Sequence, residues 1–95
     1  MGITLNIFKG GRIQSLGFKN VNGKDVTMGV IMPGEYDLGI AKRDEELTIV
    51  EGILAAKGNS FLPMPGEEPV VFKKGERIQF SCISPVAYIC RFGPK

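Results

Sequence analysis

The chain contains no histidine and no tryptophan. Without imidazole it has no Ser-His or Cys-His nucleophile pair, and it lacks a ligand that transition metals favour. No apolar run approaches eighteen residues, and the N-terminus has no basic segment followed by a long apolar one, so we expect a cytoplasmic protein without a membrane span. The formal net charge is only +2 and evenly spread, which argues against a nucleic-acid partner.

Cysteine is scarce, with only Cys82 and Cys90 present. They flank "ISPVAYI", which resembles a hairpin turning near Pro85. Such a hairpin would place Cys82 opposite Tyr88 and Cys90 opposite Phe80, too far apart along the ladder for a disulfide. We therefore expect two free, buried thiols. A catalytic thiol is not expected, because no histidine is available as its base.

The pattern of turns and short apolar segments predicts an all-β chain of one domain, residues 1–95. Thirteen glycines and six prolines are scattered as turn signals, and no stretch of ten residues has a helical stripe. Seven short strands with regular turns are typical of a sandwich or barrel. The predicted strands span residues 12–18, 25–32, 35–40, 46–56, 69–72, 77–83 and 86–92.

Strand periodicity also predicts which side chains share a face. Residues 46–56 are apolar on both sides of the pleat, as in a strand covered on both faces. The Asn-Gly pair in "NVNGKD" indicates a hairpin between the first two predicted strands. The side chains predicted to share one face are Val26, Met28, Val30 and Met32; Tyr36, Leu38 and Ile40; and Ile78, Phe80, Cys82, Tyr88, Cys90 and Phe92, with Tyr36 and Tyr88 expected to point into the barrel.

The stretch from Gly34 to Gly52 resembles the first motif of cupin barrels, which reads Gly, five residues, His-x-His, three or four residues, Glu, six residues, Gly. Ile40 and Lys42 stand at the histidine positions, and Glu45 keeps the spacing to the final glycine. Only two residues separate Lys42 from Glu45, one fewer than the motif has, so Glu46 is a rival for the glutamate position. Both imidazoles are absent. We therefore predict a single-domain, cupin-like (RmlC-type jelly-roll) β-barrel with no metal.

Four further segments carry a more specific resemblance. They are "GGRIQSLGF" (10–18), "DVTMGVIMPGEYDLG" (25–39), "EELTIVEGIL" (45–54) and "AYICRF" (87–92). Together they resemble the small cupin-type pyrimidine/purine nucleoside phosphorylases of bacteria. The resemblance implies a homodimeric pentosyltransferase that cleaves purine and pyrimidine nucleosides to free base and pentose-1-phosphate. It implies no cofactor, with inorganic phosphate as co-substrate.

The chain departs from that family at several places. Ile40 replaces a usual threonine, Asp44 replaces a usual proline, and the family's tryptophan is missing. The loop 57–68 is shorter and richer in proline, and "GPK" extends the C-terminus. These differences lie near the expected barrel mouth and bear on substrate range and on activity itself.

Two residues are predicted to be catalytic. Glu45 lies near the position of the cupin ligand glutamate, where a free carboxylate would bind ribose hydroxyls; a solvated strand-edge charge is the alternative. Tyr36 shares the inward phase and offers a hydroxyl and a ring. A core tyrosine with a satisfied hydroxyl is equally compatible with its position.

The remaining predicted site residues would bind substrate. Tyr88 would stack on the base, with a core tyrosine as the alternative. Lys42 or Arg91 would hold phosphate, although Arg91 lies on the outward phase and would serve a site at a dimer interface. Lesser polar candidates are Ser15, Thr48 and Gln79.

Two other functions remain open. One is a non-catalytic cupin-like module that binds a nucleoside, sugar or phosphate metabolite. The other is a structural domain whose barrel is filled by large side chains such as Ile40, Leu47 and Phe80.

Overall fold

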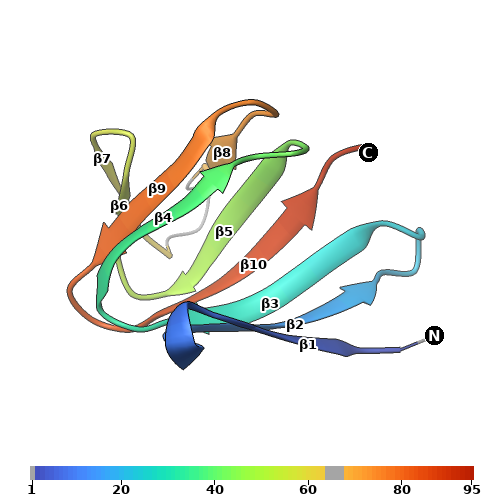
Figure 1. Ribbon diagram of the computed structural model, residues 1–95, viewed down its shortest axis with the longest axis horizontal. Coiled ribbons are helices and arrows are strands. Elements are labelled where there is room, and N and C mark those ends of the chain that lie inside the picture. The colour runs from blue at the N-terminus through green and yellow to red at the C-terminus, as the bar shows by residue number, and fades with distance from the viewer. Residues whose placement is uncertain (1, 64–67) are drawn as a thin grey trace.

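The computed structural model describes residues 2–63 and 68–95, and this part of the chain forms ten strands and one 3₁₀ turn (Figure 1). The first half contains β1 (Thr4–Phe8), the turn η1 (Lys9–Gly11), β2 (Ile13–Lys19), β3 (Asp25–Ile31) and β4 (Gly34–Ile40). The second half contains β5 (Glu45–Glu51), β6 (Leu54–Ala56), β7 (Asn59–Phe61), β8 (Val70–Phe72), β9 (Arg77–Cys82) and β10 (Val86–Phe92). No helix in the described ranges is long and apolar enough to cross a membrane.

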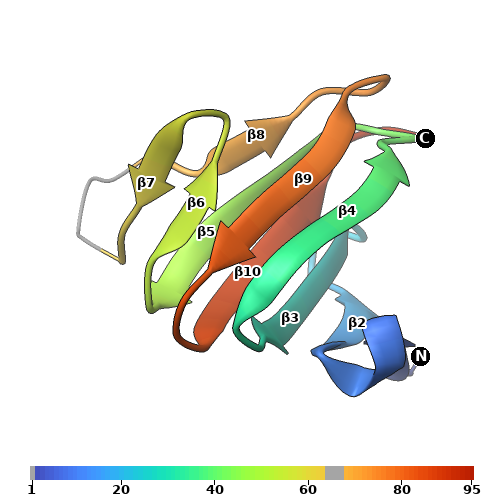
Figure 2. The same cartoon turned by 60° about the vertical axis from the view of Figure 1, so that its left-hand side comes forward.

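The strands form two antiparallel sheets that face each other (Figure 2). The six-stranded sheet has the order β1-β2-β3-β10-β5-β8, and the four-stranded sheet has the order β4-β9-β6-β7. One hydrophobic core lies between them, with Ile31, Val70, Phe72 and Val86 from the first sheet and Leu54 from the second almost fully buried. The prediction of an all-β fold is confirmed.

Burial confirms the predicted phase of the last two strands and identifies the shared face of β3 as the outer one. Ile78, Phe80, Cys82, Tyr88 and Cys90 are all buried. In β3, Met28 and Val30 share one face, as predicted, and that face is the outer one of the six-stranded sheet, where they are 46% and 45% exposed. That outer face is itself apolar, so hydrophobicity could not distinguish it from the inner one.

The predicted strand 46–56 is in fact two strands in different sheets. The chain leaves β5 at Gly52, which has φ = 92°, a conformation that favours glycine. A Cβ at this position would lie 2.5 Å from the carbonyl oxygen of Pro85. Gly52 therefore allows the chain to cross between sheets where the β9–β10 connection packs against it.

Two other connections test the turn predictions. The Asn-Gly hairpin is confirmed, since β2 and β3 pair from Lys19 and Asp25 onward. The predicted hairpin near Pro85 is wrong: β9 pairs with β4 and β6, whereas β10 pairs with β3 and β5. Cys82 and Cys90 are nevertheless free and buried, as predicted.

Candidate functional site

A cavity of about 410 Å³ lies between the two sheets, and we call it the central cavity. Its two walls differ in chemistry. The four-stranded sheet contributes only apolar side chains, namely Leu38, Ile40, Ile78 and Phe80. The six-stranded sheet contributes apolar side chains and also the polar ones, namely Asn6, Ser15, Thr27, Glu45 and Tyr88. Lys42 and Arg43 line it from the loop that joins β4 to β5.

Tyr88 is the centre of the polar wall, and its side chain is only 8% exposed. Its hydroxyl lies over Gly29, where a Cβ would come within 2.8 Å of that oxygen. Burial raises the pKa of Tyr88, and hydrogen bonds with Ser15 and Thr27 oppose this rise. Asn6 in turn donates to the Ser15 hydroxyl over 3.4 Å. Four side chains from four strands therefore present hydroxyl and amide groups along one wall.

Glu45 begins β5 and is half-buried at the edge of the same wall. Burial raises the pKa of its carboxyl, and the positive charge of Arg43 opposes that rise. The Cys90 thiol donates to Glu45 Oε1 over 3.9 Å. Burial raises the pKa of Cys90 to about 12, so this thiol keeps its proton and remains a donor at neutral pH.

The loop 41–44 holds two cations at the cavity rim. Lys42 is exposed and, within the described residues, has no ion-pair partner. Arg43 is fixed: it donates from Nη1 to Asp25 over 2.9 Å and from Nε to the carbonyl of Gly93 over 2.8 Å, and it stacks on Phe92. Sequence reasoning missed Arg43, because these partners lie 18 and 50 residues away along the chain.

The loop is also anchored by its backbone. Ala41 N donates to Glu76 O, and Gly75 N donates to Ala41 O, each over 2.8 Å. The Asp44 carboxylate accepts from Lys74 N over 2.8 Å, which turns it away from Glu45 and toward the β8–β9 turn. This bracing sets the position from which Lys42 extends.

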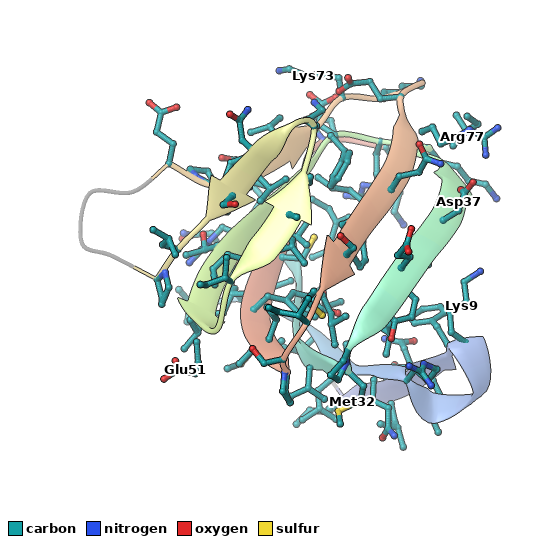
Figure 3. All side chains as sticks on the ribbon, turned by 90° about the vertical axis from the view of Figure 1, so that its left-hand side faces the viewer. Lys9, Met32, Asp37, Glu51, Lys73 and Arg77 are labelled. Atoms are coloured by element: carbon teal, nitrogen blue, oxygen red, sulfur yellow. The ribbon has the colours of Figure 1, made fainter. Side chains whose placement is uncertain are left out.

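Tyr36 is buried but does not line the central cavity. Its hydroxyl donates to the carbonyl of Met32 over 2.6 Å and accepts from Arg12 Nε over 3.3 Å, and its ring packs on Phe80. Figure 3 shows Met32 at the opposite end of the molecule from Lys73, which neighbours the turn that anchors the 41–44 loop. The geometry therefore separates Tyr36 from the central cavity, because its hydroxyl is engaged at the far end of the core. Tyr36 and Gln79 line a separate hollow on the four-stranded sheet, and the catalytic role of Tyr36 stays a prediction.

Three predicted binding residues also lie outside the central cavity. Arg91 is on the outer face of the six-stranded sheet, as its phase predicted, and donates to Thr48 over 3.4 Å. Gln79 is on the outer face of the four-stranded sheet near Asp37 and Arg77, which pair over 3.0 Å (Figure 3). The structure thus brings together Ser15, Lys42, Glu45 and Tyr88, and it separates them from Thr48, Gln79 and Arg91.

The described residues contain no group of three or more His, Cys, Asp or Glu side chains arranged to hold a metal ion. The donor set of the central cavity is one carboxylate, one protonated thiol, hydroxyls and an amide. Such groups suit a hydroxylated ligand better than a transition metal.

Comparison with known proteins identifies the family to which this sequence is similar. The family model described as pyrimidine/purine nucleoside phosphorylase matches residues 3–92. A Vibrio vulnificus (strain YJ016) protein of that name is 30% identical over 95 residues, covering 92% of this chain and 95% of that protein. A Vibrio parahaemolyticus protein of the same name is 44% identical over 57 residues, which span 60% of this chain and only 58% of that protein.

Solved structures support the fold. A protein of unknown function from Vibrio parahaemolyticus has a TM-score of 0.80 at 29% identity, covering 96% of this chain and 98% of that one. A cupin-2 domain from Rhodospirillum rubrum has a TM-score of 0.68 at 13% identity, covering 98% of this chain and 70% of that one, a likeness of fold alone. The predicted cupin-like β-fold is confirmed.

Proposed function

Because the chain belongs to the pyrimidine/purine nucleoside phosphorylase family, we propose that it cleaves purine and pyrimidine nucleosides with inorganic phosphate. The products are a free base and pentose-1-phosphate. One observation carries the assignment of the site: the central cavity combines a carboxylate and a row of hydroxyls with the ammonium group of Lys42, which has no ion-pair partner in the part of the chain that the structure describes. The ammonium group would bind phosphate, and the carboxylate would stabilise the positive charge that develops on the sugar. The hydroxyl groups would bind the hydroxyls of the ribose.

In the proposed reaction a phosphate oxygen forms a bond to C1′ of the ribose. The glycosidic C–N bond breaks, its electron pair leaves with the base, and the base takes up the proton that the hydrogen phosphate loses, so that a neutral free base and pentose-1-phosphate result. Lys42 holds the phosphate near the carbon, with the positive charge of Arg43 beside it, which lowers the entropic cost of bringing the reactants together. The ionised Glu45 accepts hydrogen bonds from the ribose hydroxyls and stabilises the positive charge that develops on the sugar. Ser15 and Tyr88 bind the sugar edge.

The first test is phosphate-dependent release of base. Chelator-treated protein is incubated with adenosine or uridine, with and without phosphate, and the bases are separated by chromatography. Release that requires phosphate supports the proposal. Tight nucleoside binding without release would instead identify a non-catalytic binding module.

Glu45 should give the pH profile of kcat/KM an acid limb, that is, a fall in rate toward low pH. Since burial raises the pKa of Glu45 and the ionised form is the working one, kcat/KM should fall as pH falls through a value above the ordinary 4.5. Phosphate ionises in a nearby range, so the limb is assigned to Glu45 by its disappearance in Glu45→Gln. An unchanged acid limb in that variant would contradict the assignment.

We also propose that two copies associate through the outer face of the six-stranded sheet. This face exposes apolar side chains from neighbouring strands: Leu5, Ile7, Leu16, Met28, Val30 and Val50 are each 45–59% exposed. Register aligns Leu5 with Leu16 and Leu16 with Met28 in one row. A continuous apolar face of this kind is typical of an interaction surface.

We assign the protein to the cytoplasm, where its free thiols remain reduced.

The dimer proposal predicts that Met28→Glu weakens self-association by about 100-fold or more, because each copy would place an unpaired charge in the interface. Analytical ultracentrifugation across a concentration series measures the dissociation constant. Val21→Glu is the control, since Val21 is fully exposed in the β2–β3 turn. A monomeric parent protein, or equal effects of both substitutions, would reject this surface.

A further inference from the structure

The apolar wall of the central cavity reaches the solvent at its mouth. Leu38 and Ile40 on β4 line the cavity and are still 37% and 51% exposed. Phe8, from β1 in the other sheet, also lines it and is 47% exposed. Three large apolar side chains therefore border one opening and are left partly covered. A ligand with a flat apolar surface would bury them and be stabilised by doing so.

A nucleoside has two chemically different halves. Its sugar carries hydroxyls, and its base offers flat faces with polar atoms only at the edge. The polar side chains come from the six-stranded sheet, together with the loop cations at the rim, and the apolar wall comes from the four-stranded sheet. If the sugar binds along the row of hydroxyls, between Glu45 and Tyr88, the base lies against the apolar wall of the four-stranded sheet.

We infer that the nucleobase binds against Leu38 and Ile40, with Phe8 contacting it from the other sheet. This inference rests on the proposed function and assigns the base-binding part of the same site. The described side chains of β4 and β9 that line the cavity carry no hydrogen-bonding group, so this wall distinguishes bases by contact area. A purine, with the larger face, should bind more tightly than a pyrimidine.

The test compares Ile40→Ala with Ile53→Ala. Ile53 is a matched control because it is 50% exposed and does not line the central cavity. Calorimetry measures binding of adenosine, uridine and ribose-1-phosphate to each protein. Ile40→Ala should weaken adenosine binding about tenfold, since removed methyl groups reduce apolar contact. Uridine should lose less, and ribose-1-phosphate, which has no base, should bind within about twofold of the parent value.

The inference is overturned if adenosine does not bind the parent protein, if Ile40→Ala binds it equally well, or if ribose-1-phosphate loses as much affinity as adenosine. Failure of the proposed function would be visible separately, as normal nucleoside binding without phosphate-dependent release of base. Thermal unfolding of both variants controls for folding, and a half-exposed position should tolerate alanine. The base contact and the chemical step are thus tested by different measurements.

Discussion

Replacing Glu45 with glutamine should lower kcat/KM for phosphorolysis by roughly 10²–10³-fold, the effect expected when one preorganised charge is removed from a transition state. The amide keeps the size and part of the hydrogen-bonding capacity of the side chain, so its loss of charge is the main change. Initial rates with adenosine and uridine at saturating phosphate measure the effect. A variant that keeps more than about a third of the parent activity would remove Glu45 from the mechanism.

The same substitution should leave the protein at least as stable at pH 7. The pKa of Glu45 is raised in the folded state, so folding disfavours the charged form, and the neutral amide avoids that penalty. As pH falls through the folded pKa toward 4.5, the parent carboxyl gains its proton and the difference in stability should disappear. Thermal unfolding at pH 7 and near pH 4 measures this convergence.

Glu46→Gln is the matched control for both measurements. Glu46 adjoins Glu45 in β5 but is exposed and does not line the central cavity. Its replacement should change neither the rate nor the unfolding temperature by much, since isolated surface charges contribute little. Equal effects at both positions would mean that overall charge, rather than the buried carboxylate, is responsible.

Replacing Lys42 with glutamine should raise KM for phosphate by about 10–100-fold, the loss expected for one charge-assisted hydrogen bond. Lys42→Arg should retain most of the affinity, because the charge remains at the rim. Rates at varied phosphate concentration and fixed nucleoside give KM and kcat separately. The KM for nucleoside should change much less than that for phosphate.

Lys74→Gln controls for general electrostatic attraction, since Lys74 is exposed on the β8–β9 turn and does not line the cavity. The local effect of Lys42 should also weaken with salt, as expected for an exposed cation. If Lys74→Gln raises KM as much as Lys42→Gln does, phosphate is held by the field of the surface rather than by the rim lysine.

Strand periodicity predicted which face a residue occupies, but not how far along the barrel it lies. Tyr36 and Tyr88 both have the inward phase, and both are buried. Only Tyr88 lines the cavity, because Tyr36 is placed near the Met32 end, where carbonyl groups occupy its hydroxyl. The position of a residue along the barrel depends on how the two sheets pack on each other. The periodicity of a single strand carries no information about that packing.

The residues that sequence reasoning missed depend on contacts between distant segments. Asn6 lies on β1, a strand that was not predicted, although Ile3, Leu5 and Ile7 alternate there. Arg43 was hidden in a run of charges, and only its contacts with Asp25 and Gly93 distinguish it from surface lysines and arginines. The polar strand β7 (Asn59–Phe61) was likewise read as part of a turn.

The separation of the two cavity walls has a consequence for how such proteins diverge. Groups that would act on phosphate and sugar belong to the six-stranded sheet and the loop, whereas Leu38 and Ile40 belong to an edge strand of the other sheet. Mutations in β4 can therefore accumulate in a lineage without disturbing the reacting groups. Ile40, at a position where the family resemblance leads us to expect threonine, would be a change of this kind. Under the proposed function, selection can alter substrate range through β4 while the six-stranded sheet and the loop preserve the reacting groups.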